Sequence, residues 1–133
     1  MLPMVAGLVA LCGVVIVGVI DATDLAITRT ALQSTADAAA LVGAESFNPA
    51  RAIVDGDVLE VRLTDRGVRR AVRVFLRDAR PDVRLDAATS SDGVTAEVVV
   101  RARWEPPLVS EFLPLHIPLT ATARARSVFA APD

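Results

Sequence analysis

Residues 2–20 form an unbroken run of 19 uncharged residues, rich in Leu, Val, Ile, Gly and Ala. A helix needs about 20 apolar residues to cross a hydrocarbon core of about 30 Å. The run therefore predicts a membrane-spanning helix at the N-terminus, and it limits what the rest of the chain can do. Every later residue must be placed relative to this segment.

A cleaved secretory signal peptide is the main alternative for the same run. Such a peptide starts with a basic region, has an apolar core of about 7–15 residues and ends at a small-x-small cleavage site. No basic residue precedes the run here, the run is longer, and no such site follows before Asp21. A lipoprotein signal is also disfavoured, because Leu11 precedes Cys12 where a small residue is needed. We expect the segment to be retained as an anchor.

A helical pattern continues beyond the apolar run to about Ser46. Pro3 is tolerated in a first helical turn, and the next proline is Pro49. At 1.5 Å per residue, such a helix would be about 65 Å long, about twice the thickness of the bilayer core. Its second half should stand outside the membrane. The residues that keep the helical period in that half are Leu25, Leu32, Ala36, Ala39, Ala40 and Gly43.

This second half also carries a family resemblance. It contains Asp21, Leu32-Gln33 and the run Ala36-Asp37-Ala38-Ala39-Ala40-Leu41, followed closely by Gly43-Ala44. These residues resemble the N-terminal signature of the TadE/TadG-like proteins of Flp (tight adherence, type IVb) pilus systems. The chain has no DxSxS motif of the longer TadG-type proteins, so the TadE-like branch is expected. The resemblance implies a pilin-like arrangement and helix-packing roles for Asp21, Asp24, Leu32, Gln33, Ala36, Asp37, Ala40 and Leu41.

Three acidic residues of the helix admit two interpretations each. Asp21 and Asp24 lie three residues apart and share a helix face where the chain leaves the apolar run. They either mark the water boundary or pair with Arg29 or with the terminal amine of a neighbouring subunit. Asp37 either fills the role of the family's aspartate or is simply exposed on a helix whose alanine side packs.

The residues after Pro49 predict a small α+β domain. Proline breaks the helix there, and the apolar pattern changes to short alternating runs. The expected elements are a hairpin over 52–63 around Asp55-Gly56-Asp57, a helix capped by Thr64 or Asp65 and running to about Ala79, a hairpin of strands 83–88 and 94–104, a proline-rich loop to Pro118 and a last strand over 119–129. The expected domain division is 1–20 transmembrane helix, 21–48 extracytoplasmic continuation and 49–133 extracytoplasmic domain.

Two parts of this domain are candidate partner surfaces. The helix over 65–79 has an apolar stripe, and off that stripe lie Arg69, Arg70, Arg73, Arg77 and Arg80. These arginines either contact anionic headgroups or an acidic neighbour, or form an ordinary solvated face. Trp104, Phe112 and Leu113 are the other candidates, because the apolar residues of the proline-rich loop either fold back over the sheet or meet a partner.

The sequence offers little for catalysis. His116 is the only histidine and Cys12 the only cysteine, so neither a zinc set nor a nucleophilic triad can be argued. No phosphate-binding glycine loop occurs, and a net charge of −2 without a basic stretch does not suggest nucleic-acid binding. We expect no enzymatic activity, no cofactor, no metal and no small-molecule substrate.

The preferred interpretation is a non-enzymatic minor pilin or pilus-assembly protein that acts by helix packing and subunit contacts. It would cross the bacterial cytoplasmic membrane once, with its C-terminal domain outside, and its partners would be membrane lipid and other pilins or pilus-assembly proteins. The first basic residue is Arg29, so the positive-inside rule says little about orientation. The alternative is a membrane-anchored extracytoplasmic binding or sensing domain that stays in the bilayer.

Overall fold

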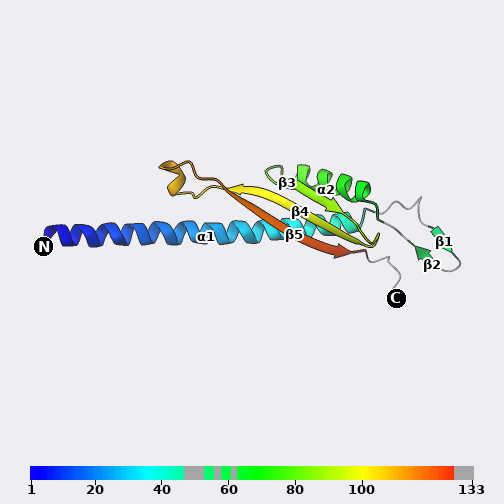
Figure 1. Ribbon diagram of the computed structural model, residues 1–133, viewed down its shortest axis with the longest axis horizontal. Helices are drawn as coiled ribbons and strands as arrows, with labels where there is room; N and C mark the ends of the chain where they lie inside the picture. Colours follow the sequence, from blue (N-terminus) through cyan, green and yellow to red (C-terminus); the bar gives the residue numbers. More distant parts are fainter. Residues whose placement is uncertain (47–52, 56–57, 61–62, 128–133) are drawn as a thin grey trace.

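The computed structural model describes the whole chain except residues 47–52, 56–57, 61–62 and 128–133 (Figure 1). It combines a long N-terminal helix, a second helix and a small antiparallel sheet, so the predicted α+β class is confirmed. The elements in chain order are α1 (Leu2–Ala44), β1 (Ile53–Asp55), β2 (Val58–Glu60), α2 (Asp65–Ala79), β3 (Arg84–Thr89), β4 (Thr95–Trp104), the 3-10 turn η2 (Val109–Glu111) and β5 (Ile117–Arg126).

Helix α1 is one continuous element of 43 residues, about 65 Å long at the usual rise per residue. The part of α1 that precedes the level of the β4–β5 loop extends alone beyond the rest of the molecule (Figure 1). By length and composition it could cross a membrane, with a mean hydropathy of 2.6 over its most apolar 18 residues, none of them buried. The helix ends at Ala44, where the Glu45 and Ser46 amides bond to the Leu41 and Gly43 carbonyls.

Strands β3, β4 and β5 form an antiparallel sheet in that order. Val98 lies opposite Ala88 on one side and Ala123 on the other, and a bulge at Asp86 shifts the β3–β4 register. Every second residue of β4 faces the core, as the alternating sequence predicts. The buried residues of β4 are Ala96, Val98, Val100, Ala102 and Trp104.

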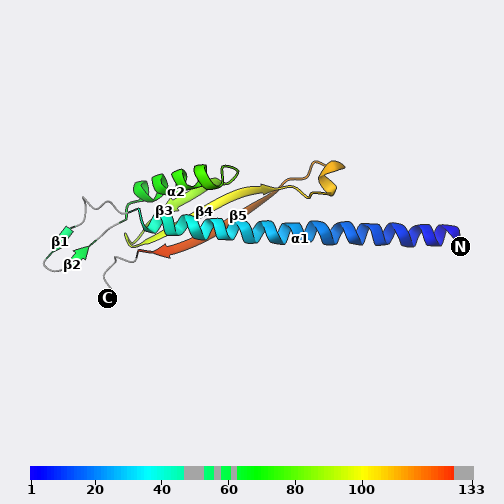
Figure 2. The same cartoon turned by 180° about the vertical axis from the view of Figure 1, so that it is seen from behind.

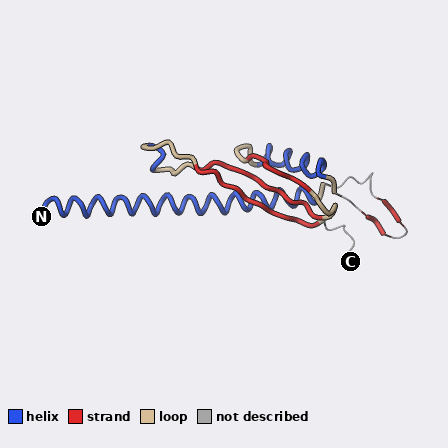
Figure 3. Tube along the Cα trace, in the orientation of Figure 1, coloured by secondary structure: helices blue, strands red, loops and turns tan. Residues whose placement is uncertain are grey.

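Both helices contribute to one core on the same face of this sheet. The C-terminal half of α1 packs against β4 and β5, and α2 packs against β3 and α1. The strands of the sheet run obliquely across α1 in both opposite views (Figures 1 and 2). The Cα trace shows both helices lying along the three strands (Figure 3). The core residues from the helices are Leu32, Ala36, Ala39, Ala40, Ala44, Val68, Val72 and Leu76.

The predicted elements of the outer part are largely confirmed. Helix α2 starts after Thr64, whose hydroxyl accepts a hydrogen bond from the Gly67 amide at 3.1 Å. Strands β1 and β2 pair antiparallel with Asp55 opposite Val58, and the turn residues 56–57 lie outside the described residues. The predicted domain division at residues 20 and 48 stays a prediction.

One boundary in the sequence analysis is wrong. The proline-rich loop was expected to reach Pro118, but β5 already starts at Ile117, with Pro118 opposite Arg103. Proline is tolerated there because β5 is an edge strand, which needs ladder hydrogen bonds on one side only. The strand ends at Arg126, and the predicted end at Phe129 lies outside the described residues.

The turn between β3 and β4 depends on one carboxylate. Asp92 accepts hydrogen bonds from the Val94 and Thr95 amides at 2.9 and 2.7 Å, and Gly93 supplies a positive φ of 74°. These amide bonds favour the charged carboxylate and lower the pKa of Asp92 from 3.8 to about 2.

This turn predicts a pH dependence of stability. A lowered folded-state pKa adds stability that is present above pH 3.8 and is lost as the pH falls towards about 2. We expect the thermal midpoint of Asp92→Asn to be lower than that of the wild type at pH 6, and the two midpoints to converge as the pH falls through this window. The pKa of Asp82 is also lowered, by its hydrogen bond to Arg80, but both proteins keep that pair. A midpoint difference that does not change with pH would contradict the prediction.

Candidate interaction surface on the long helix

The signature residues of α1 fall into four groups according to what they contact. Leu32, Ala36 and Ala40 are buried, with 2 %, 0 % and 0 % of their surface exposed. They recur at steps of four and so form one line on the helix. This line belongs to the core that α1 shares with the sheet, so these three residues pack within the chain.

Small residues let α1 come close to its neighbours at the end of this line. A Cβ atom added to Gly43 would lie 2.9 Å from Val68 Cγ1 and 3.3 Å from Ala96 Cβ, both closer than ordinary contacts. Glycine is therefore required where α1, α2 and β4 meet. The family resemblance implied helix-packing roles for residues of this half, Ala36 and Ala40 among them. In the structure this side is already covered by the chain's own domain.

Gln33 and Asp37 form a polar edge beside this buried line. The Gln33 side-chain amide donates to the backbone carbonyl of Thr122 and to Asp37 Oδ1, each at 3.1 Å. Thr122 lies on the edge strand β5, which pairs on one side only, with β4, among the residues that the structure describes. Gln33 therefore binds a free edge carbonyl, and Asp37 holds the amide in place. This contact assigns both residues a part in docking the sheet.

Leu41 is the signature residue that does not dock. Its side chain is 58 % exposed, on the side of α1 away from the core. Ile27 and Ile20 precede it by 14 and 21 residues, with Ser34 at the position between Ile27 and Leu41, and they are 63 % and 45 % exposed. Residues seven apart lie on nearly the same side of a helix. The three form an exposed apolar line, which we call the free line of α1.

Asp21 and Asp24 bind the far end of the sheet. Asp24 Oδ2 accepts a hydrogen bond from Trp104 Nε1 at 2.7 Å, and Asp21 Oδ1 accepts one from the Leu108 amide at 3.2 Å. Asp21 is only 7 % exposed. The sequence analysis placed these carboxylates at the water boundary or in pairs with cations. In the structure both carboxylates bond to the chain's own domain, and together they fasten the end of β4 and the start of the following loop to α1.

The Trp104–Asp24 bond supports a prediction about stability. A hydrogen bond to a charged group contributes about 1.5–3 kcal/mol, so we expect Trp104→Phe to lower the free energy of unfolding by about 2 kcal/mol. Asp24→Asn keeps an acceptor oxygen but removes the charge, and should cost about half as much. Urea unfolding followed by circular dichroism measures both variants. If Trp104→Phe were as stable as the wild type, the bond would have no part in holding the sheet to α1.

The loop between β4 and β5 exposes the other predicted partner residues. Phe112 is 84 % exposed and Leu113 is 55 % exposed, so they do not fold back over the sheet. The two ends of the loop are joined by His116 Nδ1 and Glu105 Oε1, 2.9 Å apart. Trp104, the third predicted residue of this set, is 6 % exposed and contacts α1 rather than a partner.

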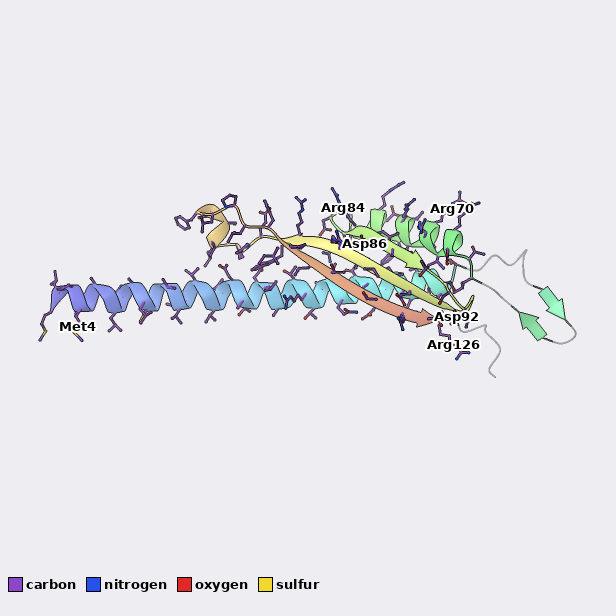
Figure 4. The ribbon with its side chains drawn as sticks, viewed as in Figure 1. Met4, Arg70, Arg84, Asp86, Asp92 and Arg126 are labelled. Carbon is purple, nitrogen blue, oxygen red and sulfur yellow. The ribbon has the colours of Figure 1, made fainter. Side chains whose placement is uncertain are left out.

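The arginines of α2 lie on its outer side. Arg69, Arg70, Arg73 and Arg77 are exposed, and Figure 4 shows Arg70 and Arg84 on the part of the molecule far from Met4. A shallow hollow of about 410 Å³ includes Arg73, Arg77 and Arg84 in its lining. No contact among the described residues favours an anionic partner over a solvated face for these side chains.

Arg80 is the exception among these arginines. It is partly withdrawn, bonding Asp82 through two nitrogens at 3.1 Å and Thr35 Oγ1 on α1 at 3.2 Å. The hydrogen bonds to Asp82 raise the pKa of Arg80, and in return they lower the pKa of Asp82. Arg80 therefore acts in fastening the end of α2 to α1.

Within the described residues, no group of three or more His, Cys, Asp or Glu side chains could hold a metal ion. The contacts that sequence reasoning missed are those of Asp24 with Trp104, Asp21 with Leu108 and Gln33 with Thr122. Each joins residues at least 80 positions apart. The alternation of Ala121, Ala123 and Ala125 in the last strand was the available signal, because it predicted close packing against an unspecified element.

Comparison with known families agrees with the resemblance seen in the signature residues. Residues 1–46 match the family model of Flp pilus-assembly TadE/G-like proteins. Neither the comparison with curated proteins nor the comparison with solved structures gave a match. The matched segment consists of α1 and its C-terminal cap, so it indicates a pilus-related component. An apolar N-terminal helix and this family together fit a membrane-anchored protein.

Proposed function

We propose that this chain is a TadE-like minor pilin or pilus-assembly protein of a Tad/Flp type IVb pilus, with no enzymatic activity. Residues 2–20 would anchor it in the bacterial cytoplasmic membrane, and the α+β domain would lie outside. The family match carries this proposal, because it covers the apolar half and the docked half of α1 together. The partners would be membrane lipid and other pilus components.

The continuous helix supports a role in assembly. The same α-helix forms the apolar segment and supplies Leu32, Ala36 and Ala40 to the domain core, with no joint between the two halves. A subunit of this form can exchange lipid contacts for helix contacts while its domain stays fixed to the helix. The contacts of Asp21 and Asp24 with the end of the sheet fix that attachment further.

The free line of α1 is the surface that we assign to other pilus components. Ile20, Ile27 and Leu41 are exposed, whereas the opposite side of the same helix is covered by the sheet. The three lie at multiples of seven residues and so on nearly the same side of α1, where an apolar surface can pack against a neighbouring helix. Neighbouring helices would therefore meet this side, and the alanine side would stay within the subunit.

Genetic complementation tests this role. In a deletion strain we expect the wild-type gene to restore surface pili and the double variant Ile27→Asp/Leu41→Asp to restore far fewer. The control is Val74→Asp, which places the same charge on an exposed valine of α2, outside the free line. Normal piliation of the deletion strain would overturn the proposed function, and normal piliation with the double variant would overturn the assignment of the free line.

A second experiment separates a filament subunit from an assembly factor. The intact mass and N-terminal sequence of the protein are measured from native membranes and from sheared surface filaments. A trimmed chain recovered with the filaments would support a processed minor pilin. If full-length protein is found only in membranes, the protein is an assembly factor and not a filament subunit. If, in addition, the deletion strain makes normal pili, the alternative of a membrane-anchored binding domain is favoured.

A further inference from the structure

The loop between β4 and β5 exposes a cluster of apolar side chains that the domain does not cover. Phe112, Leu113 and Leu115 are 84 %, 55 % and 45 % exposed, and Ile117 at the start of β5 is 39 % exposed. Phe112 and Leu113 follow η2 directly, and Pro106, Pro107 and Pro114 limit the backbone freedom of the loop. We call Phe112, Leu113 and Leu115 the loop tip.

The loop is held at a definite level along α1. Its first part is fixed by the Leu108 amide on Asp21, and the strand before it is fixed by Trp104 on Asp24. Asp21 is the first charged residue after the apolar run of residues 2–20. The base of the loop therefore lies where the membrane segment of α1 ends. Beyond it the loop points back along α1 towards the N-terminus (Figures 1 and 3).

We propose that the loop tip inserts into the interfacial region of the outer leaflet of the membrane that anchors α1, as a second membrane contact of the chain. The inference rests on the anchored orientation in the proposed function, but not on a role in a pilus. Lipid is the occupant because the end of the apolar segment sets the height of the membrane surface, and the tip lies at that height. Moving the exposed Phe and Leu side chains from water into the interfacial region at this level lowers the free energy.

The charges around the loop indicate which lipids it contacts. Residues 105–116 contain Glu105, Glu111 and His116 but no arginine, and Asp21 and Asp24 lie at the base. The loop therefore has no arginine or lysine with which to attract anionic headgroups. The contact should therefore depend on apolar insertion and should form with zwitterionic lipid. The arginines of α2 lie at a different part of the domain (Figure 4).

Depth-dependent fluorescence quenching tests the proposal with the full chain. Cys12 is the only cysteine, so Cys12→Ala provides a background in which Leu113→Cys can carry a single environment-sensitive fluorophore. The protein is placed in phosphatidylcholine nanodiscs containing lipid with a quencher near the headgroup. The matched control carries the label at Arg126→Cys, an exposed site at the other end of β5 (Figure 4). A label on native Cys12 reports separately whether the helix lies in the bilayer.

We expect the Leu113→Cys label to be quenched several-fold more strongly by the lipid quencher than the Arg126→Cys label, and to be shielded from a quencher dissolved in water. Adding Phe112→Ser and Leu115→Ser to the protein labelled at Leu113→Cys should reduce this quenching. The fluorescence of Trp104 then shows whether the domain is still folded. If the lipid quencher quenches the Cys12 label but the Leu113→Cys label is accessible to the aqueous quencher, the proposed lipid contact is wrong although the helix is anchored. Shielding that disappears on dilution to one chain per disc would also overturn it, in favour of a second copy. An unquenched Cys12 label would overturn the anchor itself.

Discussion

Leu32→Ala should lower the free energy of unfolding of this protein by about 2–5 kcal/mol, the usual range for removing a buried leucine side chain. Leu32 is 2 % exposed and belongs to the core between α1 and the sheet. The substitution removes apolar contacts and leaves a cavity that the rigid helix and the paired strands can close only in part. The prediction concerns the docking of α1, not the formation of the helix, because alanine is the better helix former.

Leu41→Ala is the matched control. Leu41 is the other leucine of the family signature, lies on the same helix and is 58 % exposed, so its truncation should change stability by less than about 0.5 kcal/mol. Denaturant unfolding of the full chain in detergent micelles measures both variants. Trp104 is the only tryptophan and is 6 % exposed, so its emission reports on the domain. If Leu32→Ala and Leu41→Ala lowered the free energy of unfolding equally, α1 would not be packed against the sheet through Leu32.

Gly43→Val should cost about 3 kcal/mol, the upper part of the usual range for overpacking a core. The new Cβ would start 2.9 Å from Val68 Cγ1, and both γ-methyl groups would add to the overlap. Val68 cannot move aside easily, because it is fully buried and a β-branched side chain in a helix is restricted to one main rotamer. The gain in helix propensity over glycine is only a few tenths of a kcal/mol.

Gly18→Val controls for the change in backbone propensity. No atom lies within 4 Å of a Cβ built on Gly18, so valine is accommodated there and the stability of the domain should be unchanged. The same unfolding assay applies to both variants. A cost for Gly43→Val no larger than that for Gly18→Val would mean that the contact of α1 with α2 is looser than described.

The individual elements could be predicted from sequence because each has a local signal. The apolar run and the absence of proline between Pro3 and Pro49 predicted α1. The Thr64 cap and the stripe of Val68, Val72 and Leu76 predicted α2, and strict alternation predicted β4. These signals depend on residues a few positions apart, so they need no knowledge of the tertiary arrangement.

The docking of α1 could not be predicted in the same way. Ala36, Ala40 and Gly43 indicate that something approaches the helix closely, but small residues do not say whether the neighbour is another subunit or the chain's own sheet. Ala121 and Ala123 of β5, which belong to the same core, lie about 80 residues away and carry only the complementary signal of a small-residue face. The polar contacts of Asp24 and Gln33 follow from that docking, so they were missed together with it.

The unbroken course of α1 also fixes the rotational relation between the apolar segment of residues 2–20 and the α+β domain. One residue of an α-helix corresponds to a turn of about 100° and a rise of about 1.5 Å. A single residue inserted between Ile20 and Asp21 would therefore swing the entire sheet about the helix axis by more than a quarter of a revolution, while lifting it very little. The number of residues between the apolar segment and Asp21 thus determines which way the domain faces about the axis of α1.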